Sequence, residues 1–246
     1  ELADEISLPI LEAWSGASAD RLSAAVGDKL QNSILKTIYL KLSGRLQGRA
    51  VAIGYSHEMP EGPNIWHVYP DGGVATLCDS LAADLRDRVE MESPVEKIYV
   101  ENERVVGIRV RGEDRPVAAV VSTVPCSVLP KLISGSDALQ PLAHFRFRPM
   151  VFVCMRFDRS MFLEDTVLWT AGCGFPFFRL TETTRSMPWL APPGKTLVTA
   201  DIGCELGDAV WTEDDESLGK RCVDALASRY SGIRDSYAGC RVLRTP

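Results

Sequence analysis

The sequence predicts a mixed α/β protein whose C-terminal part is an α+β arrangement of strands and a helix. Helical and strand-like apolar spacings alternate after residue 66. Val117–Thr123 is a near-continuous β-branched run, typical of a strand buried on both faces of a parallel sheet. Asp214–Tyr230 has the amphipathic spacing of a helix and follows several short apolar runs. A chain of 246 residues can bury one good-sized core or two small ones.

The N-terminal third is predicted to be helical. Leu2–Ser15 carries apolar residues at helical spacing, with Pro9 as a kink, and Gly16 ends this helix. Asp20–Leu46 predicts one or two further helices. Two prolines in Met59–Asn64 indicate a linker-like break before the next section.

The middle third alternates between helix and strand. A helix is predicted from about Val74 to Arg88, with a short strand at Val89–Glu92 after it. Ser93–Val100 and Arg104–Val110 predict a hairpin, and the buried strand Val117–Thr123 follows.

The last third is mostly strands, with one helix that begins after a possible cap at Thr212. The strands are expected at Met150–Phe157, Val167–Thr170, Phe175–Thr181, Lys195–Ile202 and Arg241–Leu243.

Composition excludes several classes of function. A net charge of -6 and a pI near 5.2 argue against a nucleic-acid partner, because a phosphate backbone would be repelled. No apolar run reaches the roughly 18 to 20 residues that a membrane span needs. The seven cysteines are scattered without a CxxC pair and only three histidines are present, so no metal site is expected. Scattered thiols predict a reducing compartment, the cytoplasm.

Two short patterns imitate functional motifs. Gly194-Lys195-Thr196 is similar to the end of a phosphate-binding loop, but Trp189 stands where the earlier glycine is required. The acidic run Glu213–Glu216 is interpreted as the N-terminal turn of a helix, where negative charge is favourable, and not as a metal loop.

Five segments in a fixed order carry a family resemblance. They are Tyr69-Pro-Asp-Gly-Gly73, Leu81-Ala-Ala83, Ser93-Pro-Val-Glu-Lys-Ile98, Val105-Val-Gly-Ile-Arg-Val110 and Val120-Val-Ser-Thr-Val-Pro125. Together they resemble the second FAD-binding stretch of the amine oxidase superfamily, which includes protoporphyrinogen oxidases and phytoene desaturases. Phe177-Phe-Arg-Leu-Thr-Glu182 and the segments around Ala191 and Val210 resemble the later sheet of protoporphyrinogen oxidase-like members.

The resemblance implies the two-domain FAD/NAD(P)-binding flavoprotein architecture. Residues 1–65 would be the helical part of a substrate domain, 66–132 a segment of the FAD domain, and 133–246 the substrate-domain sheet and helix. The family's GxGxxG turn, which holds the FAD pyrophosphate at a helix N-terminus, is not in the sequence. We therefore expect the central portion of such an enzyme, incomplete at both ends.

The resemblance also assigns cofactor residues. The backbone N–H and C=O at the position of Val95 would hydrogen-bond the adenine edge, and Pro94 would help to fix the extended strand. Thr123, Val124 and Pro125 would end a buried strand at the sheet edge where α/β proteins place ligands. Gly72 and Gly73 would permit close backbone approach before the helix. The alternatives are a core valine, a plain strand end and an ordinary turn.

Substrate contact is expected from Arg179 and Phe177, which lie in an aromatic-rich strand. Arg179 could instead be an exposed edge residue, and His67 is more simply a structural hydrogen-bonding group. No catalytic residue is named, because a flavin performs the redox step itself. The expected substrate is a small organic molecule. The alternatives are a redox-neutral flavin mutase, which would need converging cationic residues, and a non-enzymatic binding module that kept the fold.

Overall fold

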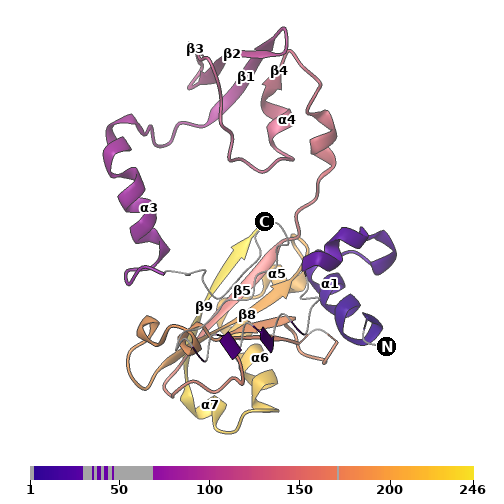
Figure 1. The fold of residues 1–246 in the computed structure, drawn as a ribbon, viewed down its shortest axis with the longest axis vertical. Helices are drawn as coiled ribbons and strands as arrows, with labels where there is room; N and C mark the ends of the chain where they lie inside the picture. Colours follow the sequence, from indigo (N-terminus) through magenta and orange to yellow (C-terminus); the bar gives the residue numbers. More distant parts are fainter. Residues whose placement is uncertain are drawn as a thin grey trace. The chain divides into compact units, whose positions relative to one another are not determined.

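The computed structural model describes residues 3–29, 69–170 and 172–246, together with the isolated positions 35, 38, 39, 42, 43 and 46. The chain divides into two compact units (Figure 1). Unit 1 comprises Glu1–Gly73 and Arg148–Pro246, and unit 2 comprises Val74–Phe147. The linker expected at Met59–Asn64, most of the helical region up to Leu46, and His67 lie outside the described residues.

Unit 1 is built on a five-stranded sheet in which all neighbours are antiparallel. The strand order is β6 (Val167–Trp169), β7 (Arg179–Thr181), β8 (Thr196–Gly203), β5 (Met150–Phe157) and β9 (Tyr237–Thr245). All five predicted strands are therefore confirmed, although β7 begins later than expected and β9 is longer.

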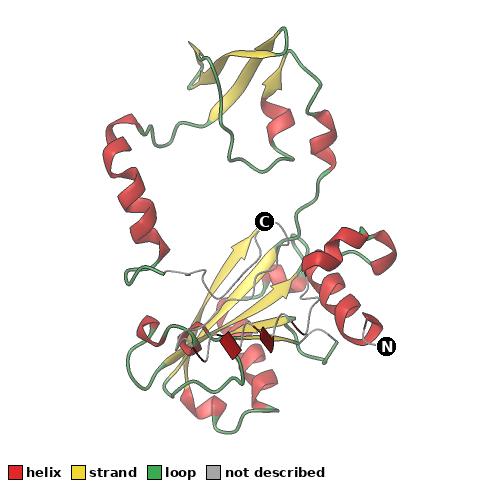
Figure 2. Ribbon diagram, viewed as in Figure 1, coloured by secondary structure: helices red, strands yellow, loops and turns green. Residues whose placement is uncertain are grey.

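One face of this sheet forms the core of unit 1. Alternate residues of β5, from Val151 to Phe157, are at most 1% exposed. They pack with Leu218, Cys222 and Leu226 of helix α6 (Asp215–Ala227). Figure 2 shows the helices and loops around the yellow strands. Helix α6 thus packs on one face of an antiparallel sheet, whereas the sequence predicted only a sheet covered by helices.

Helix α6 is capped by Asp214 and not by Thr212. The Asp214 side chain accepts a hydrogen bond from Ser217 N at 3.0 Å, which satisfies a backbone donor in the first turn. Thr212 instead ends the short helix α5 (Ala209–Thr212), and α7 (Ile233–Ser236) follows α6. The expected cap was wrong because a second helix occupies the preceding residues.

The chain start is helical in unit 1. A π-helical turn, η1 (Ala3–Ser7), leads into α1 (Leu8–Ser15), and Gly16 ends it at φ 73°. Pro9 lies in the first turn of α1, directly after the change from π-helical to α-helical geometry, and the expected kink at Pro9 stays a prediction. Two 3₁₀ turns, η2 (Ala19–Arg21) and η3 (Ala24–Lys29), come next.

Arg148 connects α1 to the sheet. Its Nη1 donates to the carbonyl oxygens of Glu12 and Ala13 at 3.0 and 2.6 Å, at the C-terminal end of α1. A Cβ on Gly203 would lie 2.5 Å from Arg148 Nε, so a larger residue there would displace the guanidinium from this position. This contact holds the helix against the end of β8.

Unit 2 contains a four-stranded sheet in the order β3 (Glu113–Pro116), β2 (Arg104–Val110), β1 (Val95–Glu101), β4 (Ile133–Ser134). The predicted hairpin is confirmed: β1 and β2 are antiparallel, and Asn102 and Glu103 turn the chain at φ 49° and 61°. The remaining elements are α3 (Val74–Ala82), η4 (Ala83–Arg88), α4 (Leu129–Leu132) and η5 (Gln140–His144).

Two predicted strands of unit 2 are wrong. Val89–Glu92 is a turn, with Glu92 in the left-handed region at φ 54°. Val117–Thr123 has no regular structure, and Val121 is 94% exposed. A strand needs a hydrogen-bonded neighbour, and no described strand pairs with either segment. The β-branched composition was therefore not sufficient to make a strand.

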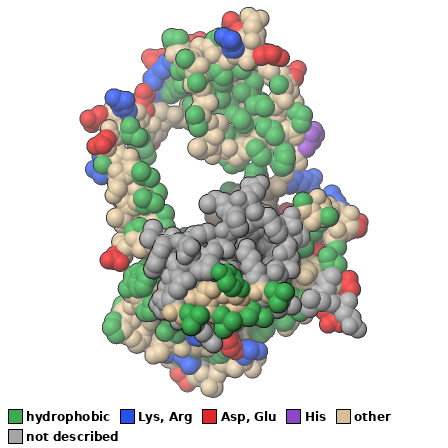
Figure 3. Space-filling model, viewed as in Figure 1, with side chains coloured by type: hydrophobic (Ala, Val, Ile, Leu, Met, Phe, Trp, Pro, Cys, Tyr) green, Lys and Arg blue, Asp and Glu red, His purple; other side chains and the backbone are tan. Residues whose placement is uncertain are grey.

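The predicted helix Val74–Arg88 is confirmed as α3 and η4, but its apolar side is not covered within the described chain. Leu77, Leu81 and Leu85 are 52%, 71% and 49% exposed. Figure 3 shows hydrophobic side chains along this helix and over the visible surface of unit 2. None of the described helices is long and apolar enough to cross a membrane.

Candidate functional site

The face of the five-stranded sheet opposite α6 is the candidate site, and we call it the open face. Its side chains follow from the strand register. The first row runs Arg179, Asp201, Phe152 and Leu243, and the second runs Thr181, Thr199, Cys154 and Arg241. Thr199 Oγ1 lies 3.7 Å from Cys154 Sγ, as neighbours on one face should. Most of these side chains are partly exposed, in contrast to the core face.

A buried ion pair lies in the first row. Arg179 Nε donates to Asp201 Oδ2 at 2.7 Å, and Nη2 pairs with the same oxygen. The Asp201 side chain is 2% exposed, whereas that of Arg179 is 31% exposed. The guanidinium is therefore the part of this pair that a molecule on the open face would meet.

Burial dominates the electrostatics of this carboxylate. Loss of solvent raises the pKa of Asp201, while the charge and hydrogen bond of Arg179 act in the opposite direction. Removing Arg179 would leave the buried Asp201 charge without its partner, which typically costs about 3 to 5 kcal/mol. The ion pair therefore holds the Arg179 guanidinium in one position on the open face.

Aromatic rings surround the guanidinium. Arg179 Cζ lies 5.5 Å from the centroid of the Trp169 ring, which stacks on Phe178 at 6.1 Å and contacts Trp14 of α1 at 6.0 Å. Cation–π contact and stacking restrict the rotamers of all these side chains. The arrangement offers flat apolar surface beside hydrogen-bond donors, which suits a planar polar molecule.

Phe177 lies elsewhere than expected. It is 2% exposed, belongs to the core of unit 1, and stacks on Phe175 at a centroid distance of 5.3 Å. Its position before the start of β7 explains this, because the strand alternation begins only at Arg179. The neighbouring residues 177 and 179 therefore contact different environments.

The predicted cofactor residues lie at the boundary of the units and in unit 2. Gly73 N donates to Pro70 O at 2.9 Å, and Gly73 has φ +85°, so the turn by itself requires a glycine there. No heavy atom lies within 4 Å of a Cβ built at Gly73, and Gly72 is exposed, so a ligand could approach this described turn closely.

Val95 is the first residue of β1. On one side it pairs with Val110, while β4 pairs with β1 only at Ile98 and Tyr99. No described strand therefore covers the other edge of β1 at Val95, which leaves room for a ligand edge. Pro94 before it is exposed.

Thr123, Val124 and Pro125 are exposed and follow an irregular segment, so they do not end a strand as expected. Residues lie at the end of a sheet strand only if that strand is paired with a neighbour, and no described strand pairs with the segment before Thr123. Their contact with a cofactor stays a prediction.

Glu182 organises a second region of unit 1. It is fully buried, and its carboxylate accepts hydrogen bonds from Phe162 N, Leu163 N and Thr196 Oγ1 at distances of 2.8 to 3.2 Å. Thr196 is also bonded to Thr184. This one carboxylate thus joins the loop after β5, the turn after β7 and the start of β8.

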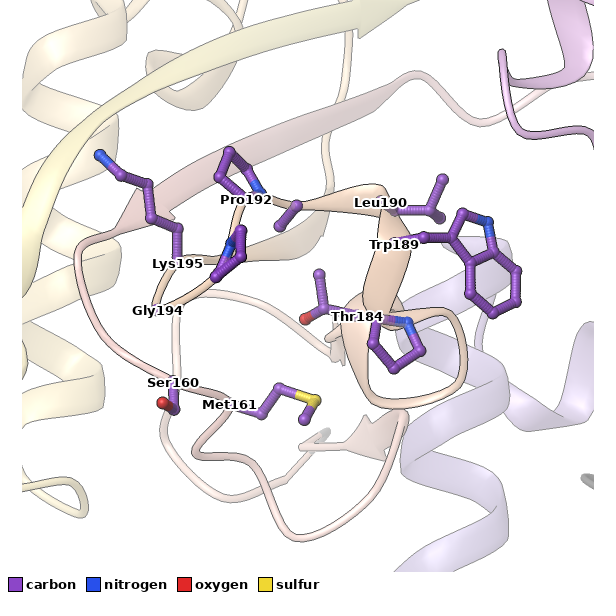
Figure 4. Close-up of a pocket in the computed structure, with 11 residues that line it drawn as sticks. Ser160, Met161, Thr184, Trp189, Leu190, Pro192, Gly194 and Lys195 are labelled. Carbon is purple, nitrogen blue, oxygen red and sulfur yellow. The ribbon is translucent and has the colours of Figure 1, made fainter.

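The loop after β5 and the segment from Thr184 to Lys195, which leads into β8, line a surface groove of about 790 Å³. Figure 4 shows Ser160 and Met161 on one wall, with Trp189 and Lys195 toward opposite ends. The full lining is Ser160, Met161, Thr184, Pro188, Trp189, Leu190, Ala191, Pro192, Pro193, Gly194 and Lys195. The groove contains none of the predicted site residues. The residues after Gly194 lead into the strand β8, whereas a phosphate-binding loop would be followed by a helix.

Sequence reasoning missed Asp201. A usable signal existed, because Asp201 is the only charged residue within β8, an otherwise uncharged strand. Its pairing with Arg179 depends on the β7–β8 register, which the sequence did not reveal. Among the described residues no group of three or more His, Cys, Asp or Glu could hold a metal ion.

Comparison with solved structures supports the fold. A reduced UDP-galactopyranose mutase superimposes with a TM-score of 0.68 at 14% identity, covering 99% of this chain and 51% of the mutase. A protein provisionally assigned as a protoporphyrinogen oxidase, from Exiguobacterium sp. 255-15, gives 0.54 at 17% identity over 84% of this chain and 45% of its own. A putrescine oxidase with putrescine bound gives 0.53 at 13% identity over 70% and 38%.

The chain thus spans about half the length, or less, of these structures. No curated protein matches the sequence significantly. The sequence profile of flavin containing amine oxidoreductases, in contrast, matches residues 8–240, nearly the whole chain. The expected mixed α/β flavoprotein architecture is confirmed, and the chain belongs to the family of flavin containing amine oxidoreductases.

Proposed function

We propose that this chain is the substrate-side part, with a segment of the cofactor domain, of an FAD-dependent oxidoreductase that oxidises a small organic molecule. The open face would form the protein wall of the substrate cavity. The observation that carries this proposal is the Arg179–Asp201 pair, held among aromatic rings on the exposed side of the sheet. A polar pair placed there has no role in the packing against α6.

The FAD would be held in part by unit 2. The uncovered edge of β1 at Val95, after Pro94, supports backbone hydrogen bonds to the adenine ring. The open turn at Gly72 and Gly73 supports close contact with the cofactor, and residues 123–125 complete the proposed set. The exposed apolar side of α3 also supports this assignment, because unpartnered apolar surface of this kind usually marks an interaction site.

When bound, the flavin supplies the redox chemistry by accepting a hydride from a C–H bond of the substrate. The residues of this chain would bind and orient. Arg179 would donate hydrogen bonds to an acceptor on the substrate, and Asp201 would keep the guanidinium in place. Trp169 would provide a flat surface that excludes water from one side of the substrate.

The test is a charge-conserving substitution in the full-length enzyme. Arg179→Lys keeps a cation near Asp201 but loses the planar guanidinium and its ring contact. We expect a higher KM or a lower kcat with unchanged flavin content. Arg159→Lys is the matched control, because Arg159 also lies over an aromatic ring, Phe162 at 5.0 Å, on the core side of the sheet. If kcat and KM of Arg179→Lys differed from those of the parent enzyme no more than the values of Arg159→Lys do, the proposal would be contradicted.

A second candidate is a redox-neutral flavin mutase. It is favoured by Arg241 and Arg156, which the strand register places on the open face together with Arg179, since a diphosphate needs more than one cation. Binding of a nucleoside diphosphate by the full-length protein, lost in Arg241→Ala, would support the mutase over the oxidoreductase.

A non-enzymatic module is the third alternative, and a full-length protein purified without flavin would support it. The scattered cysteines keep the cytoplasm as the proposed location.

A further inference from the structure

The two charges of the open-face pair are unequally placed. Asp201 is almost completely buried and lies behind the guanidinium, while about a third of the Arg179 side chain is exposed. Nε and Nη2 of Arg179 both bind Asp201 Oδ2. Among the described residues, the printed hydrogen bonds of Arg179 use only Nε and Nη2, and Nη1 has two further N–H donors.

The carboxylate changes what this guanidinium attracts. An isolated arginine favours carboxylates and phosphates because it combines donors with a positive charge. Here a negative charge lies in contact with the cation on its buried side, so the pair presents donors with little net field. A ligand carboxylate bound to the outer edge of Arg179 would also be repelled by Asp201 through a poorly solvated region.

We infer that Asp201 is a specificity-determining residue that makes the open face favour an uncharged hydrogen-bond acceptor, such as an amide or ketone oxygen, over a carboxylate. This inference rests on the proposed function, in which the substrate lies on the open face. The ring of Trp169, braced by Phe178 and Trp14, adds a preference for planar ligands.

Matched probes test the inference in the full-length holoenzyme. 2-Naphthamide and 2-naphthoate share a flat two-ring body and differ in the charge of the polar group. We expect the parent protein to bind 2-naphthamide more tightly in isothermal titration calorimetry. Asp201→Asn keeps an acceptor for Arg179 at nearly the same volume but removes the negative charge. Its affinity ratio should shift toward 2-naphthoate by about tenfold or more, the scale of one uncompensated charge near a protein surface.

Two controls separate charge from shape. The double variant Asp201→Asn with Arg179→Gln has neither charge. Its ratio of affinities for 2-naphthamide and 2-naphthoate should therefore return to within about threefold of the parent ratio. Raising the NaCl concentration should weaken 2-naphthoate binding to Asp201→Asn, because the freed cation is partly exposed and screened by salt. The preference of the parent protein for 2-naphthamide over 2-naphthoate is measured without any variant, so the inference is testable even if Asp201→Asn folds poorly.

A parent protein that prefers 2-naphthoate, or an Asp201→Asn ratio within threefold of the parent, would overturn the inference. If Arg179→Lys nevertheless alters kcat or KM, the proposed function stands although the inference about Asp201 fails. Failure of both probes to bind either protein would overturn the inference and also count against the open face as the substrate wall.

Discussion

Replacing Glu182 by Ala should destabilise unit 1 strongly. The fully buried carboxylate is the shared acceptor for two backbone N–H groups, of Phe162 and Leu163, and for the hydroxyl of Thr196. Alanine removes every one of these acceptor atoms. The loop after β5 and the start of β8 would lose the group that joins them.

The magnitude follows from the unsatisfied donors. A buried donor without a partner costs about 1 to 3 kcal/mol. The Thr196 hydroxyl retains Thr184 as a partner, so the two amides dominate the loss. We expect the free energy of unfolding to fall by about 4 kcal/mol in Glu182→Ala. Glu182→Gln keeps one acceptor oxygen and the volume, and should lose about half as much.

Urea unfolding followed by tryptophan fluorescence measures this loss, because Trp14, Trp169 and Trp211 lie in unit 1. Glu164→Ala is the matched control: it removes a glutamate of the same loop that is 50% exposed, and should cost below about 1 kcal/mol. A loss below about 1 kcal/mol in Glu182→Ala would refute the reasoning, since water would then replace the carboxylate at no cost.

Three further outcomes are expected. Gly219→Ala should destabilise α6 against β9, by about 1 to 3 kcal/mol in urea unfolding, because the new Cβ would lie 2.5 Å from Cys240 Sγ; an unchanged midpoint would contradict this. The hydrogen bonds of Tyr230 and Arg229 hold the pKa of Glu164 at about 2, so their stabilisation is present above about pH 4.5 and is lost as pH falls toward 2. Glu164→Gln should therefore be less stable than the parent at pH 7 and equal to it near pH 2, in thermal unfolding at both values. The 246-residue chain alone should retain no stoichiometric FAD, because the pyrophosphate-binding turn is not in its sequence; one equivalent of flavin absorbance after desalting would oppose this.

The sequence predicted local elements where the apolar period is unambiguous. Helix α6, the β1–β2 hairpin and the long strands β5 and β8 follow from spacing alone. The prediction failed at Val117–Thr123, because β-branched composition describes a preference and strand formation also needs a paired neighbour. Thr212 failed as a cap for a similar reason, since the preceding helix already included it.

The sequence by itself determined the family-specific order of segments in the middle of the chain and that Arg179 lies in an aromatic-rich segment, whereas the ring that it contacts, Trp169, comes from the neighbouring strand β6. The sequence could not determine which charged side chains lie together in the site. Arg179 and Asp201 are separated by 21 residues, and only the β7–β8 register brings them into contact. The burial that raises the pKa of Asp201 likewise depends on tertiary packing, which short-range spacing does not encode. Short-range spacing encodes which face a residue occupies, whereas long-range pairing decides which charges meet on that face.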